Sequence, residues 1–90
     1  MIENAHRAAW DAVFRARGTL RTIERAAEQL AADNPSTAAT QRWLSLAGTA
    51  WAAGEDCLDL IAGDEATPGE IGAFLARVDE IENRARQIIP

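Results

Sequence analysis

Few residues in this chain are able to act as a nucleophile or a base. His6 is the only histidine, Cys57 is the only cysteine, and tyrosine is absent. A catalytic thiol needs a neighbouring base, so His6 with Cys57 is the only cysteine–histidine pair available. In a helical hairpin that turns near Asn34, positions 6 and 57 lie several residues out of register. We therefore expect no enzyme activity, and we interpret Cys57, which stands beside leucine and isoleucine, as a buried apolar residue.

Sequence motifs for a cofactor or a metal ion are also missing. The chain contains no glycine-rich phosphate loop, no HExxH zinc motif and no GxSxG nucleophile turn. A single cysteine excludes an intrachain disulfide and two-cysteine zinc sites. We expect no catalytic, cofactor-binding or metal-binding residues.

Acidic residues are concentrated in one segment of the chain. Residues 43–76 contain six acidic residues and no arginine, a local charge of −6, whereas the whole chain has a net charge of −5. Several of these carboxylates surround a predicted helix C-terminus, where the helix dipole makes negative charge mildly unfavourable. The predicted acidic patch comprises Glu55, Asp56, Asp59, Asp64 and Glu65.

Three interpretations of this acidic patch remain open. In the first, the acids form interhelical ion pairs worth about 0–1 kcal/mol each at a surface, and the expected pairs are Arg7 with Asp59, Arg15 with Glu55, and Arg77 with Asp56. In the second, the carboxylates bind a divalent cation, although helical spacing offers no looped run of ligands. In the third, they form a recognition patch for a basic protein, because clustered charge speeds encounter and fixes orientation.

Composition also limits the kind of partner. A net charge of −5 disfavours direct binding to nucleic acid or to an anionic membrane, since both require clustered positive charge. The N-terminus lacks the pattern of a secretory signal, and no segment is apolar over the length needed to span a bilayer. We expect a cytoplasmic protein whose partner is another protein, with a basic or uncharged surface.

The elements that position these residues follow from apolar periodicity. Ninety residues allow one domain, 1–90, with a modest core. Spacings of three and four predict helices over about 2–32, 35–62 and 68–89. The first break is DNPS at 33–36, where Asn34 suits an N-cap and Pro35 a first helical position. The segment from Thr67 to Glu70 resembles a capping box with proline at its first position.

These helices predict an all-α fold, an antiparallel up-down-up three-helix bundle, because short connections make neighbouring helices antiparallel. The first helix has one apolar seam, which Trp10 and Phe14 flank, and the sequence leaves open whether Gly18 kinks it. The second helix has two apolar stripes, so we expect each stripe to face a neighbour. The third helix is shorter, so the first hairpin should project beyond it.

Together, these features predict a non-enzymatic protein–protein interaction module. A more specific hypothesis is a small acidic inhibitor that occupies the basic, nucleic-acid-binding surface of its partner, by analogy of size and charge with compact phage and mobile-element proteins. The alternative is a structural or assembly protein that homo-oligomerises, as a dimer, through exposed apolar helix surface. Trp10 and Phe14 are predicted to mediate either partner binding or this self-association.

Overall fold

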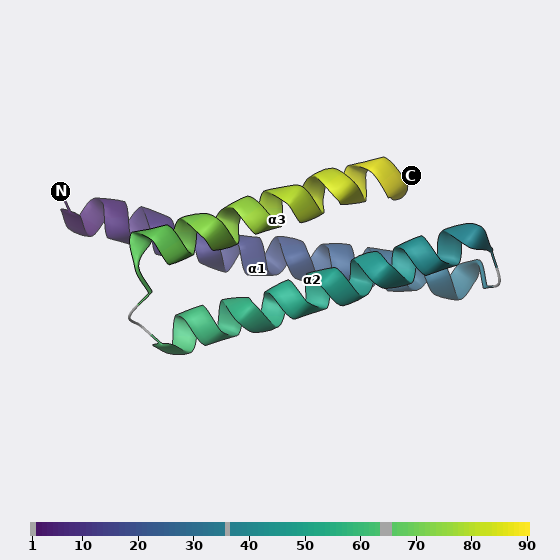
Figure 1. The fold of residues 1–90 in the computed structure, drawn as a ribbon, viewed down its shortest axis with the longest axis horizontal. Coiled ribbons are helices and arrows are strands. Elements are labelled where there is room, and N and C mark those ends of the chain that lie inside the picture. The colour runs from purple at the N-terminus through teal and green to yellow at the C-terminus, as the bar shows by residue number, and fades with distance from the viewer. Residues whose placement is uncertain (1, 36, 64–65) are drawn as a thin grey trace.

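The computed structural model describes residues 2–35, 37–63 and 66–90, with side-chain environments from residue 7 onward. It contains helices α1 (Ile2–Asp33), α2 (Ala38–Gly63) and α3 (Pro68–Ile88), which run up, down and up along one long axis (Figure 1). The predicted all-α three-helix bundle is therefore confirmed. None of these helices, over the described residues, is long and apolar enough to cross a membrane.

A single hydrophobic core joins the three helices. Its large buried side chains include Val13, Leu20 and Ile23 of α1, Leu46 of α2, and Ile71, Phe74, Val78 and Ile81 of α3. These residues recur at the helical spacing of three and four that the sequence shows for α1 and α3. Burial of each large apolar side chain favours folding by about 1.5–3 kcal/mol, so the seams of the helices hold the bundle together.

One buried contact defines the register of α1 against α2. The thiol of Cys57 lies 3.7 Å from the carbonyl oxygen of Val13, to which it donates a weak hydrogen bond. Because the two helices are antiparallel, positions nearer the end of α1 lie beside positions nearer the start of α2. Trp51 of α2 is therefore level with Thr19 and Leu20 of α1.

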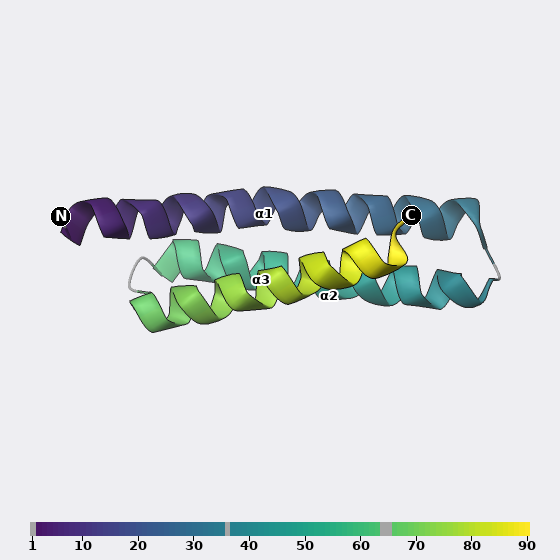
Figure 2. The ribbon, with the colours of Figure 1, turned by 90° about the horizontal axis from the view of Figure 1, so that it is seen from above.

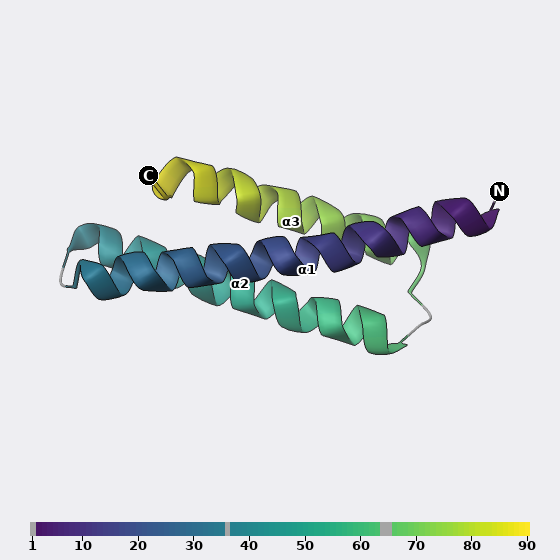
Figure 3. The same ribbon diagram turned by 180° about the vertical axis from the view of Figure 1, so that it is seen from behind.

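The shorter α3 leaves part of the first hairpin uncovered, as expected from the helix lengths. The indole Nε1 of Trp43 donates a hydrogen bond of 2.9 Å to the carbonyl oxygen of Ile88, so the last turn of α3 is level with Trp43. Beyond this level, the end of α1 and the start of α2 continue past the C-terminus (Figures 2 and 3).

The predicted start of α2 is wrong by three residues. The helix begins at Ala38 rather than near Pro35, and the hydrogen bonds of Thr37 are those of an N-cap residue. The hydroxyl of Thr37 accepts from the backbone N–H of Thr40 at 3.2 Å, and the Thr40 hydroxyl accepts from the N–H of Thr37 at 3.2 Å. This reciprocal pair is a capping box with threonine in place of the usual glutamate. Asn34 instead caps α1, where its Nδ2 donates to the carbonyl oxygen of Leu30 at 3.1 Å.

The start of α3 is as predicted. Thr67 is the N-cap, and its hydroxyl accepts from the N–H of Glu70 at 3.1 Å, while Pro68 occupies the first helical position. Helix α1 runs without a break through Gly18, so that residue does not end or divide the helix.

The prediction that both apolar stripes of α2 face a neighbour is wrong for three large residues of the second stripe, although Ala47 of the same stripe is buried. Leu44, Trp51 and Leu58 belong to this stripe, and they are 48%, 58% and 38% exposed. Helices α1 and α3 both pack against the other stripe, which contains the buried Leu46 and Cys57.

The capping box of α2 predicts that removing one hydroxyl lowers the stability of the fold. In Thr40→Ala, the free energy of unfolding should fall by about 1–2 kcal/mol, because the buried hydroxyl that satisfies the N–H of Thr37 is lost. Chemical denaturation followed by circular dichroism measures this change. Thr22→Ala is the control, since that hydroxyl bonds only the Gly18 carbonyl on the exposed side of α1; its stability should stay within about 0.5 kcal/mol of the wild type. Equal losses in the two variants would contradict this role.

Candidate interaction surfaces

A groove with an acidic rim lies where α2 and α3 diverge toward their connection (Figure 1). Its volume is about 650 Å³. The exposed carboxylates of Asp56 and Asp59 from α2 and of Glu70 from α3 line it, above an apolar floor. This floor comprises Leu60, Ala66, Ala73 and Phe74. We call this site the acidic groove.

One ion pair crosses the acidic groove. Arg77 of α3 donates to the carboxylate of Asp56, and this is the only arginine of the lining. Among the described residues, Asp59 and Glu70 make no ion pair. The groove therefore keeps two carboxylates without an ion pair beside an apolar floor, although Glu70 lies in the first turn of α3, where the helix dipole favours it. Such a site suits a ligand that combines a cationic group with an apolar stem, as arginine does.

The three expected interhelical ion pairs have different outcomes. Arg77 pairs with Asp56 as predicted. In the described structure, Arg7 and Arg15 form no ion pair with Asp59 or Glu55. Intrachain pairing therefore accounts for one of the three described members of the predicted acidic patch, Asp56.

The predicted patch is also divided between two surfaces. Glu55 does not line the acidic groove but lies in a second groove, between α1 and α2, of about 300 Å³. Asp64 and Glu65 lie outside the described residues. In the described ranges, no three side chains of histidine, cysteine, aspartate or glutamate converge in a way that suits a metal ion.

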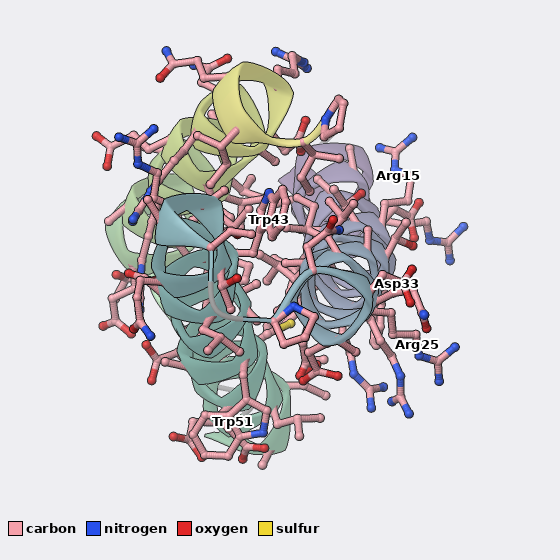
Figure 4. The ribbon with its side chains drawn as sticks, turned by 90° about the vertical axis from the view of Figure 1, so that its right-hand side faces the viewer. Arg15, Arg25, Asp33, Trp43 and Trp51 are labelled. Atoms are coloured by element: carbon pink, nitrogen blue, oxygen red, sulfur yellow. The ribbon has the colours of Figure 1, made fainter. Side chains whose placement is uncertain are left out.

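The second groove carries an apolar surface that we expected, from the sequence, to be buried against a neighbouring helix. Trp51 and Leu58 line it from α2, opposite Arg17 and Arg21 of α1. Figure 4 shows Trp51 pointing away from α3, whereas Trp43 points inward among the helices. With Leu44, which lies seven residues before Trp51, these side chains form what we call the exposed apolar face. The sequence shows the spacing of seven residues between these side chains, but it does not show whether another helix buries them.

The two residues predicted for apolar binding differ in their surroundings. Trp10 is half-buried and packs against the core, so less of it is available to a partner. Phe14 is 54% exposed and lies three and seven residues before Arg17 and Arg21, on the same side of α1. Phe14 is therefore next to the arginines of the second groove along α1, although it is not among the residues that line this groove.

Cys57 is fully buried, as its apolar neighbours predicted. Burial raises the pKa of its thiol, and the positive charge of Arg17 opposes this effect in part. The thiol is therefore neutral near pH 7 and a poor nucleophile. The side chain of His6 lies outside the described side chains, so the predicted pairing of His6 with Cys57 cannot be placed.

No protein-family model, curated protein or solved structure matches this chain.

The buried thiol predicts slow chemical labelling. In the folded chain, Cys57 should react with a thiol reagent such as Ellman's reagent only as fast as the core opens, and it should react at once in guanidinium chloride. The control is a Cys57→Ala, Ala32→Cys variant, whose exposed thiol should react immediately in the folded state. Equally fast labelling of the two folded proteins would contradict the burial of Cys57.

The raised pKa of Cys57 also predicts a dependence of stability on pH. The unfolded thiol ionises from about pH 8.5 upward, whereas the folded thiol stays protonated to higher pH. Its contribution to stability is thus complete below that value and is lost as the pH rises through the folded pKa. Denaturation of the wild type and of Cys57→Ala should show this alkaline loss in the wild type alone. A similar loss in both proteins would assign the effect to other groups.

Proposed function

We propose that this chain is a non-enzymatic interaction module that binds a basic protein surface through the acidic groove. The observation that carries the proposal is the placement of two carboxylates without an ion pair, Asp59 of α2 and Glu70 of α3, in one groove with apolar side chains. An arginine or lysine side chain fits this combination, because its methylene stem packs on the floor while its charge meets the rim.

The net charge of the chain supports the same class of partner. Its value of −5 attracts a basic surface over a distance of about one Debye length, close to 8 Å at physiological salt. Clustered negative charge therefore speeds encounter with a positively charged protein and orients it. Direct binding to nucleic acid is disfavoured by the same charge.

A nucleic-acid-binding protein presents such a basic surface. In the specific form of the proposal, this chain occupies that surface and excludes nucleic acid, and so acts as a small acidic inhibitor. The acidic groove supplies the docking position, and the rest of the negative surface supplies long-range attraction. No step of this mechanism needs a nucleophile, a metal or a cofactor.

Charge neutralisation in the groove tests this proposal. Asp59→Asn with Glu70→Gln should abolish capture of a basic partner from host lysate, and the wild-type complex should dissociate steeply as salt rises. Mass spectrometry identifies the partner, and added DNA or RNA should compete with the wild-type chain for it.

The matched control carries the same charge change outside the groove. Asp11→Asn with Glu28→Gln neutralises two exposed acids of α1, so this variant should retain the partner. Circular dichroism must show wild-type helicity for both variants. Equal retention by both variants, or capture of a partner that is neither basic nor competed by nucleic acid, would contradict the proposal.

A further inference from the structure

We propose that Arg77 limits the affinity of the acidic groove, because it occupies the carboxylate of Asp56 in place of a basic side chain of the partner. The inference rests on the proposed function, since it concerns how the same groove receives a basic protein. Arg77 and Asp56 both line the groove and pair across it. An arginine of the partner that reaches this end of the groove therefore meets a carboxylate that already has a cation.

The two walls of the groove have the same spacing of residues. Helix α2 contributes positions 56, 59, 60 and 63, and helix α3 contributes positions 70, 73, 74 and 77. Because the helices are antiparallel, the ion pair that joins 56 to 77 places Gly63 level with Glu70. In the same register, Asp59 is level with Ala73 and Phe74. Among the described residues, only position 56 therefore faces a cation on the opposite wall.

The other two carboxylates lie toward the end of the groove at which α2 and α3 diverge (Figure 1). Asp59 and Glu70 face small or apolar residues there, so the opposite wall supplies them with no cation. A basic side chain of another protein has the charge that this end of the groove lacks. Such a partner binds Asp59 and Glu70 without a competitor, whereas at Asp56 it competes with Arg77.

The intrachain ion pair is held weakly enough to be exchanged. The side chain of Arg77 is 41% exposed and that of Asp56 is 54% exposed. Ion pairs at such exposure contribute little to stability, because water solvates both partners well. While Arg77 stays in the groove, its charge also repels an incoming cation. Arg77 therefore lowers the affinity for a basic partner in two ways, by occupying a carboxylate and by repulsion.

Fluorescence anisotropy of a labelled oligoarginine peptide measures this affinity with the full chain. At physiological salt, Arg77→Gln should bind the peptide about fivefold more tightly than the wild type, because it removes the repelling charge and frees a third carboxylate. Glutamine has nearly the helix propensity of arginine, so circular dichroism should show wild-type helicity. If Arg77 only supports the structure of the groove, the variant binds equally or more weakly. That result would overturn the proposal.

Two further variants separate the groove from net charge. Arg86→Gln makes the same charge change on α3 and also removes an exposed ion pair, with Glu82, but it lies outside the groove. Its affinity should stay within about twofold of the wild type, because salt screens charges beyond about 8 Å. Asp56→Asn with Arg77→Gln keeps the wild-type net charge and should restore the wild-type affinity. Equal tightening by Arg86→Gln, or a double variant as tight as Arg77→Gln, would contradict the role of Arg77.

The variant Asp59→Asn with Glu70→Gln distinguishes failure of this inference from failure of the proposed function. If this variant loses the peptide but Arg77→Gln does not bind it more tightly, the groove binds cations and only the inference fails. If this variant binds the peptide as well as the wild type does, both the inference and the proposed function fail. Absence of binding by both the wild type and Arg77→Gln would also overturn both.

Discussion

The packing of α1 against α2 through small side chains is the interaction on which the rest of the structure depends. Buried alanines of both helices belong to the core, namely Ala16, Ala27, Ala50 and Ala53, and the thiol of Cys57 on α2 contacts Val13 of α1. Small side chains let two helices approach closely, but they leave little room between the axes for large ones. The larger apolar residues of α2 must then lie at the edges of the contact. Trp43 and Leu46 face α3 or the core, whereas Trp51 and Leu58 remain in water.

A third helix covers only one side of this pair. Helix α3 packs along the α1–α2 pair with Phe74, Val78 and Ile81, and ends where Trp43 bonds Ile88. Its position produces both candidate surfaces. The acidic groove lies where α3 diverges from α2, and the exposed apolar face is on the side of the pair that α3 does not reach.

Local signals in the sequence defined the helices well but not the surroundings of each helix face. Apolar periodicity identified the buried seams of α1 and α3, and the chemistry of Thr67 with Pro68 identified the start of α3. The start of α2 was missed because Pro35 suits a helix start, while a threonine at Thr40 is a less familiar member of a capping box. The acidic patch was defined by sequence proximity. Successive residues of a helix point about 100° apart, which is why Glu55 and Asp56 lie on different surfaces.

Coverage of a helix face is a tertiary property, so periodicity alone does not predict it. The second stripe of α2 shows the spacing of a buried seam, yet Leu44 and Trp51 are exposed. Trp10 and Phe14 show the same limit on α1. They lie about one turn apart, yet Trp10 packs against the core and Phe14 is exposed. The predicted fold, register and projecting hairpin follow from lengths and periods. The division into an acidic groove and an exposed apolar face required the position of α3.

The central proposal is that the acidic groove is the surface through which this bundle binds a basic partner. NMR spectroscopy of the ¹⁵N-labelled chain tests it most directly, because the indole N–H signals of Trp43 and Trp51 report on parts of the bundle away from this groove. Addition of an arginine-rich peptide should shift the amide signals of Asp59 and Glu70 while both indole signals stay fixed. Equal movement of the indole and amide signals, or no movement of any of them, would contradict the proposal.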